Sequence, residues 1–149
     1  MNDKELAPKV MALYGAVIAL LREGADLNNV TVAEIATRAG IGKGTVYEYF
    51  SNKEEMIAQA LFHELKADCQ QMYGLISREK DLYEKMNLVL IRMEEKMAEM
   101  NCFVRTMQIM LDNSVISSRM REMAENKKEE DILVTDVIRK IIDDEGGTV

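Results

Sequence analysis

The chain has 149 residues, of which 19 are basic and 26 are acidic, so its net charge is −7. This length suits one compact domain, or a small head that shares a core with a larger body. The sequence contains no apolar run of about 18 residues and no charged-then-apolar leader, which excludes a membrane-spanning chain and predicts a cytoplasmic protein. Its two cysteines do not suggest a disulfide framework.

Apolar residues recur at spacings of three and four throughout, with a single proline and no alternating pattern, which predicts an all-α fold. The first helix is expected at about residues 4–22. Thr31 and Glu34 form a capping box that begins a second helix, and Gly40 ends it because glycine tolerates the left-handed backbone of a helix C-cap. A third, short helix is expected at about residues 43–49.

The second and third helices are predicted to pack at a steep angle. The apolar side chains that would lock them together are Val32, Ile35, Ala36, Ile41, Val46 and Phe50. The polar and aromatic side chains of the third helix then point outward. Two short helices joined by a tight glycine turn in this way are typical of a helix-turn-helix that reads DNA.

Beyond the third helix, Ser51 and Glu54 predict a second capping box and a fourth helix that continues to about residue 76. Further helices are expected at about residues 81–100, at about 102–111 and, as one long last helix, at about 116–142. We therefore predict a helix-turn-helix DNA-binding domain at residues 1–50. Residues 51–149 are predicted to form a helical domain for effector binding and dimerisation, with the fourth helix as the connection between the two.

Residues 40–55 resemble the N-terminal DNA-binding domain of the TetR family of transcriptional regulators, and the looser match extends over about residues 6–60. The resemblance implies that four residues enter or edge the major groove: Lys43, Gly44, Thr45 and Tyr49. It implies that three others hold phosphates: Thr31, Tyr47 and Lys53. Two features depart from the family: Gly42 replaces the usual serine or similar cap, and no basic arm precedes Lys4.

The acidic net charge opposes DNA binding at first sight, and neither half of the chain is basic. Affinity would then depend on a few placed cations and on two heads for each operator. Lys43 and Lys53 lie at helix starts, where the helix dipole favours an acid, and a phosphate partner would resolve that conflict.

The family resemblance also implies a homodimer and a palindromic operator. Members usually continue for two more helices beyond the position of Gly146, and those helices pair with a second subunit. The chain is therefore interpreted either as a fragment of a longer regulator, which we favour, or as a shortened member that dimerises differently.

The body is expected to enclose one pocket for an apolar small-molecule effector, because methionine side chains adapt to irregular shapes. The candidate lining residues are Met93, Met97, Phe103, Met107 and Met110, with Arg92, Arg105 or Gln108 as possible polar anchors. The same spacing is also typical of ordinary buried core.

Catalysis has little support in the sequence. His63 is the single histidine, Cys69 lies off its helical face, and two cysteines with one histidine do not make an ordinary zinc site. We therefore expect no enzyme, metal or cofactor, but a transcriptional repressor that an effector releases from double-stranded DNA. The alternative is an all-helical protein-interaction module that has lost DNA reading.

Overall fold

The computed structural model describes residues 7–98 and 101–146, and this part of the chain contains eight α-helices and no strand. The prediction of an all-α fold is confirmed. The helices are α1 (Pro8–Arg22), α2 (Val32–Ala39), α3 (Lys43–Tyr49), α4 (Lys53–Ser77), α5 (Leu82–Ala98), α6 (Asn101–Asp112), α7 (Ser114–Glu125) and α8 (Val134–Gly146). None of the described helices combines the length and the hydropathy that a bilayer-spanning segment needs.

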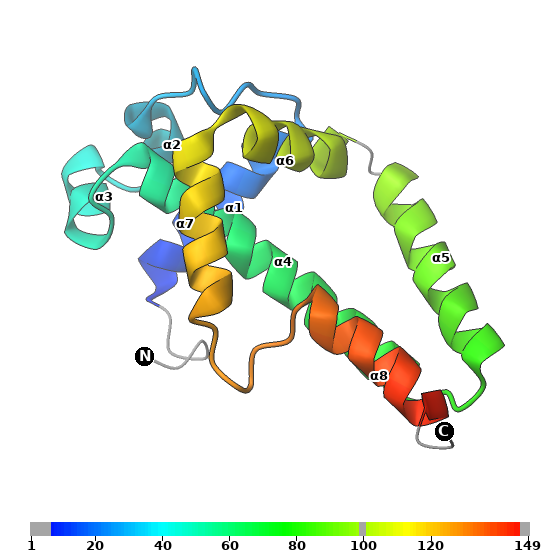
Figure 1. The fold of residues 1–149 in the computed structure, drawn as a ribbon. Helices are drawn as coiled ribbons and strands as arrows, with labels where there is room; N and C mark the ends of the chain where they lie inside the picture. The colour runs from blue at the N-terminus through cyan, green and yellow to red at the C-terminus, as the bar shows by residue number, and fades with distance from the viewer. Residues whose placement is uncertain (1–6, 99–100, 147–149) are drawn as a thin grey trace.

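The long helix α4 runs through the whole molecule and organises it (Figure 1). Helices α1, α2 and α3 surround its N-terminal end, where α6 and α7 also pack. Helix α8 lies along the C-terminal half of α4, and α5 flanks that half (Figure 1). Helix α4 therefore connects the end of the molecule formed by α1, α2 and α3 to the end where α5 and α8 lie.

Two separate groups of buried side chains stabilise the two ends of the molecule, one group at each end. The first core contains residues of α1, α2, α3 and the N-terminal half of α4, together with Ile109, Ile116 and Met120 from α6 and α7. The second core joins α4 to α8 and contains Cys69, Met72, Ile76, Val137 and Ile141. Because α6 and α7 contribute to the first core, the head shares its interior with part of the predicted body.

The predicted long last helix is wrong. Helix α7 ends at Glu125 and α8 begins only at Val134. A charged segment with a turn connects them, and Lys127 holds it by donating to the Asp131 carbonyl oxygen (2.9 Å) and pairing with Asp136 (3.3 Å). This break allows the apolar face of α8 to pack on α4.

Two predicted helix starts also differ. The N-cap of α4 is Asn52, whose side chain accepts a hydrogen bond from the Glu55 backbone N–H (2.8 Å), so the predicted capping box at Ser51 is not formed. Helix α1 begins at Pro8, four residues after the predicted start at Lys4, and Lys4 itself lies outside the described residues. Proline suits the first position of a helix because a backbone N–H at that position would have no acceptor within the helix, so its absence breaks no hydrogen bond.

Candidate nucleic-acid interface

The start and the end of α2 are fixed by local interactions. The Thr31 hydroxyl oxygen accepts from the Glu34 backbone N–H (3.1 Å), and the Glu34 carboxylate accepts from the Thr31 backbone N–H (2.9 Å). Gly40 follows α2 with φ of +72°, in the left-handed region where other residues are strained. The predicted capping box and the glycine stop are both confirmed.

Buried apolar residues set the orientation of α3. Val46 is 1% exposed and Phe50 is 4% exposed, and both belong to the first core. The Phe50 ring also packs against the Tyr14 ring of α1, with 6.1 Å between ring centroids. Because Val46 and Phe50 fix the inner side of α3, the opposite side faces solvent.

The outer side of α3 carries most of the residues predicted to contact DNA. Lys43, Gly44, Tyr47 and Tyr49 are exposed, and Thr45 is half-buried. Tyr47 and Tyr49 keep 50% and 41% of their surface exposed, so both phenol groups are accessible. Among the described residues, no hydrogen bond or ion pair engages the side chains of Lys43, Tyr47 or Tyr49. These polar groups are therefore available for an outside partner.

Thr31 and Lys53 lie beside this surface but already have intramolecular partners. The Thr31 hydroxyl oxygen accepts from Glu34 and keeps its own proton for donation. The Lys53 ammonium donates to the backbone carbonyl oxygens of Asn28 (2.9 Å) and Val30 (3.0 Å), which leaves one of its three N–H groups. Lys53 thus anchors the loop before α2, a role that sequence reasoning missed because it depends on a contact across 23 to 25 residues.

Another cation of the head, Arg38, is held by an acid. Its guanidinium donates to both carboxylate oxygens of Glu23. The hydrogen bonds from Arg38 lower the pKa of the Glu23 carboxyl below its ordinary value. This pairing reduces the positive charge that α2 presents to solvent.

A polar network joins the head to α7 through the first turn of α4. The Arg119 guanidinium donates to both carboxylate oxygens of Glu55 (2.9 and 2.8 Å), and Gln59 also donates to Glu55 (2.5 Å). The Tyr14 hydroxyl of α1 completes the network by donating to Gln59 (3.1 Å). Burial by itself would raise the pKa of the Glu55 carboxyl, but the hydrogen bonds from Arg119 and Gln59 lower it overall.

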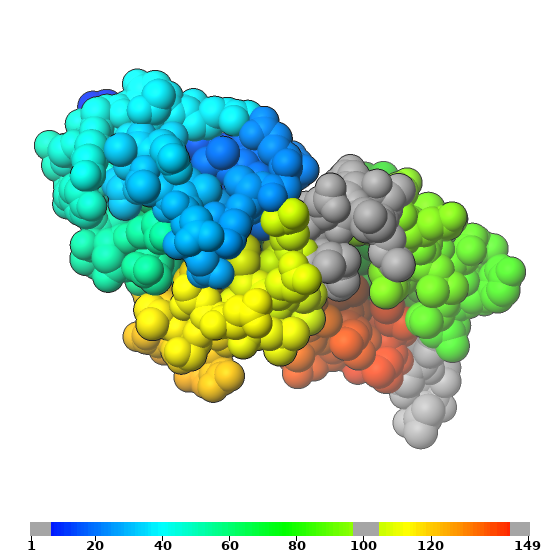
Figure 2. Space-filling model, turned by 90° about the horizontal axis from the view of Figure 1, so that it is seen from above, coloured from blue at the N-terminus to red at the C-terminus, as the bar shows by residue number. Residues whose placement is uncertain are grey.

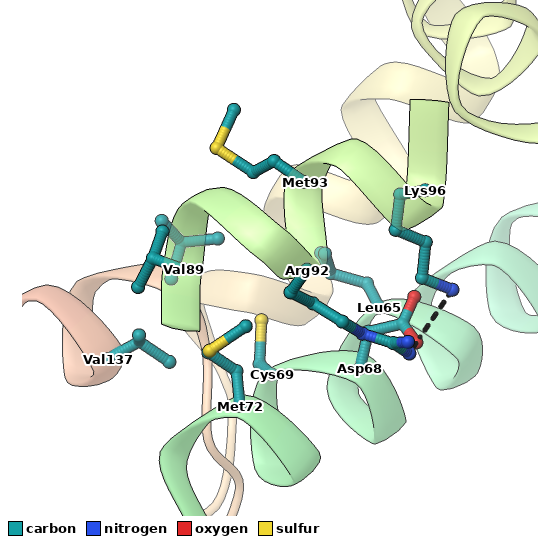
Figure 3. A pocket seen from close by; sticks show the side chains of 10 residues that line it. Leu65, Asp68, Cys69, Met72, Val89, Arg92, Met93, Lys96 and Val137 are labelled. Carbon is teal, nitrogen blue, oxygen red and sulfur yellow. Dashed lines mark hydrogen bonds and ion pairs between the residues drawn. The ribbon is translucent and has the colours of Figure 1, made fainter. Parts of the chain in front are cut away.

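At the far end of α4, a cavity of about 280 Å³ lies between α4, α5 and α8 (Figure 3). Most of its wall is apolar and comes from Leu65, Cys69, Met72, Val89, Met93, Val134 and Val137. Burial raises the pKa of the Cys69 thiol to about 11, with a smaller contribution from Asp68, so the thiol is neutral and adds to the apolar wall.

One side of this cavity is charged. Asp68 of α4 pairs with Lys96 (3.0 Å) and with Arg92 (3.4 Å), both from α5, as Figure 3 shows. Arg92 also donates to Gln71 (2.8 Å) and pairs with Glu95 (3.2 Å). Among the described residues, the buried Nε of Arg92 has no hydrogen-bond partner.

The predicted effector residues are only partly brought together here. Met93 and Arg92 line the cavity. Met107 is exposed on α6 and Met110 packs against the first core, so neither lines it. The side chains of Met97 and Phe103 lie outside the described residues.

The other two proposed polar anchors lie elsewhere. Arg105 and Gln108 line a separate polar cavity of about 340 Å³ between α6 and the loop from α1 to α2.

Residues 21–60 match the family described as "Bacterial regulatory proteins, tetR family". The chain is similar to a fatty acid metabolism regulator protein of Bacillus subtilis (strain 168), with 29% identity over 87 residues that make up 58% of this chain and 44% of that protein. Its fold is similar to that of the fatty acid degradation regulator FadR from Bacillus halodurans, with a TM-score of 0.67 and 20% identity. That likeness covers 82% of this chain and 64% of the solved one, so the chain spans less than two thirds of either relative.

Proposed function

We propose that this chain regulates transcription by binding double-stranded DNA through α3, because residues 21–60 match the tetR family of bacterial regulatory proteins and contain a helix-turn-helix. The observation that carries the proposal is the orientation of α3. Its apolar side is held in the first core by Val46, while Lys43, Tyr47 and Tyr49 are exposed together. A short helix held with a polar outer side fits the major groove of B-DNA.

The proposed contacts fall into two groups. Lys43, Gly44, Thr45 and Tyr49 meet or edge the bases of the major groove, where Gly44 allows a close approach of the backbone. The Thr31 hydroxyl, the Tyr47 phenol and the remaining N–H of Lys53 donate to phosphate oxygens.

The proposed regulator is a repressor that acts as a homodimer on a palindromic operator. A chain with a net charge of −7 has no broad positive field, so one head is expected to bind weakly. Two heads on one operator raise the affinity because the second binding event becomes intramolecular. A protein that reads bacterial operators acts in the cytoplasm, which we propose as its location.

The proposed effector occupies the cavity between α4, α5 and α8 and dissociates the repressor from DNA. The apolar wall suits a hydrocarbon chain, and the cationic side chains of Arg92 and Lys96 in the same lining suit an anionic head group. The names of the two relatives, which concern fatty acid metabolism and degradation, agree with a ligand of this class.

Selection of bound sequences from random duplex DNA tests the proposal. We expect an inverted repeat, bound with an affinity that falls steeply as salt rises. A matched variant, Tyr47→Phe with Lys43→Met, removes two polar groups that have no described intramolecular partner and is expected to weaken binding without loss of fold. If the wild-type chain enriches no sequence, the proposal is refuted and a helical protein-interaction module becomes the better interpretation.

A further inference from the structure

Three side chains from outside the α1–α2 pair hold the loop that connects these two helices. Arg105 of α6 donates to the Ala25 carbonyl oxygen (3.3 Å), and the Asn113 side chain at the start of α7 donates to the Asn28 side-chain oxygen (3.2 Å). Lys53 of α4 donates to two carbonyl oxygens of the same loop. Figure 2 shows α6, in yellow, lying against this blue segment of the chain. We call these three side chains the loop clasp.

The loop held by the clasp is internally rigid. The Asp26 carboxylate accepts from the Asn28 backbone N–H (3.0 Å) and from the Asn29 side chain (2.7 Å). The Val30 backbone N–H donates to the Asp26 carbonyl oxygen (3.1 Å), and Leu27 is only 1% exposed. A loop tied in this way moves as a unit, and it leads directly into the N-cap of α2.

The loop is also shaped around Arg105. Gly24 has a φ of +88°, which disfavours other residues, and a Cβ at this position would lie 3.3 Å from the Arg105 Nη2 atom. The end of α1 therefore leaves room for the guanidinium, so Arg105 lies in a built contact and not on an open surface.

We propose that Arg105 and Asn113 are positioning residues for DNA reading. Through their contacts with the loop before α2, the orientation of α2 and α3 depends on the positions of α6 and α7 as well as on that of α4. Helix α5, which lines the distal cavity, is separated from α6 by two residues of the sequence. Because α5 and α6 are in contact, a displacement of α5 by a ligand would be passed to α6, and from α6 through the clasp to Thr31 and α2. This inference rests on the proposed function, since it assigns a route to the regulation of the same DNA-binding surface.

The test uses the full chain with Arg105→Met and Asn113→Ser, singly and together. Methionine keeps the aliphatic length of arginine but has no donor. The Asn113 side chain accepts hydrogen bonds from the Val115 and Ile116 backbone N–H groups at the start of α7, and serine can still cap the helix in this way. Arg105→Lys restores a donor, and Arg121→Met removes an exposed charge of α7 as a matched control. The readouts are amide hydrogen exchange and affinity for the duplex that the wild-type chain selects.

The double variant is expected to exchange faster at the Asn29 and Val30 amides, with unchanged protection in the middle of α4. Its DNA affinity should fall by about 2- to 30-fold, and Arg105→Lys alone should retain most of the wild-type affinity. Loop exchange or DNA affinity equal to that of the Arg121→Met control would overturn the inference. If the wild-type chain selects no DNA sequence, the proposed function itself fails and the positioning role falls with it, whereas faster loop exchange would still establish the clasp.

Discussion

Lys43 and Lys53 begin α3 and α4, and replacement of each by methionine is expected to affect stability in opposite directions. The Lys43 ammonium has no described intramolecular partner and lies at a helix N-terminus, where a cation is unfavourable by about 0.3 kcal/mol or more. Lys43→Met should therefore leave the melting temperature unchanged or raise it by about 1 °C.

Lys53→Met instead removes two hydrogen bonds from a charged donor, at 2.9 and 3.0 Å, and leaves two loop carbonyl oxygens without that partner. A hydrogen bond to a charged group contributes about 1.5–3 kcal/mol, but water can replace part of it at this half-buried position and the helix dipole becomes more favourable. The expected net loss is about 1–2 kcal/mol in the free energy of unfolding. For a chain of this size it corresponds to a fall of about 2–8 °C in melting temperature.

The assay combines thermal unfolding with DNA titrations between about 50 and 200 mM salt. Each proposed phosphate contact contributes about 0.9 to the slope of log affinity against log salt, so losing such a contact should flatten the slope by about that amount. Lys80→Met, which removes an exposed charge far along the chain from the head, serves as the control. A Lys53→Met chain that melts at the wild-type temperature would refute the anchoring role, and an unchanged salt slope for Lys43→Met would remove Lys43 from the phosphate contacts.

Three further changes probe other parts of the structure. Arg119→Met should cost about 1–3 kcal/mol near pH 7 in denaturant unfolding. Because the pKa of Glu55 is lowered in the folded state, this stabilisation is lost as pH falls below about 4.5, and the free energies of unfolding of variant and wild type should converge there. Equal stability of the two proteins at neutral pH would contradict a stabilising Arg119–Glu55 pair. Gly40→Ala should destabilise by about 1 kcal/mol because of its left-handed backbone, whereas the control Gly74→Ala within α4 should stabilise slightly; the opposite order would be inconsistent with the α2 stop. Dodecanoate is expected to raise the melting temperature of the wild-type chain, and Arg92→Met should abolish that rise; a full rise in the variant would exclude Arg92 as the anchor.

The head could be predicted from the sequence because local interactions determine it. The capping box at Thr31, the glycine at position 40 and the inward Val46 are each specified within a few residues of their partners. The start of α4 was missed by one residue because Ser51 and Asn52 are both good N-caps, and the packing of the chain after Phe50 decides between them.

The body could be predicted only in outline because its arrangement depends on contacts between distant segments. The apolar spacing continued from Met123 to Leu133 closely enough to resemble one helix, although the charged residues between them form a connecting segment, after which α8 packs against α4. Spacing identified Met93 and Met107 as equivalent, and both are partly exposed, but only Met93 lines the cavity, whereas Met107 lies on another helix. Which helix faces meet is set by the path of the chain and not by the period of its side chains.

The cavity and the proposed DNA-reading surface lie toward opposite ends of α4, whose 25 residues span about 38 Å. The change in DNA affinity that a ligand must cause is nevertheless modest. A tenfold loss of DNA affinity requires a preference of about 1.4 kcal/mol for the non-reading conformation. Burial of one methylene contributes about 0.8 kcal/mol, so two carbons buried in only one conformation suffice. If the cavity holds a hydrocarbon chain, release of DNA by linear carboxylates of about six to fourteen carbons should become up to about fourfold more effective with each carbon until the cavity is full. Competition titrations measure this directly, and a potency independent of chain length would show that the apolar wall does not bind the effector.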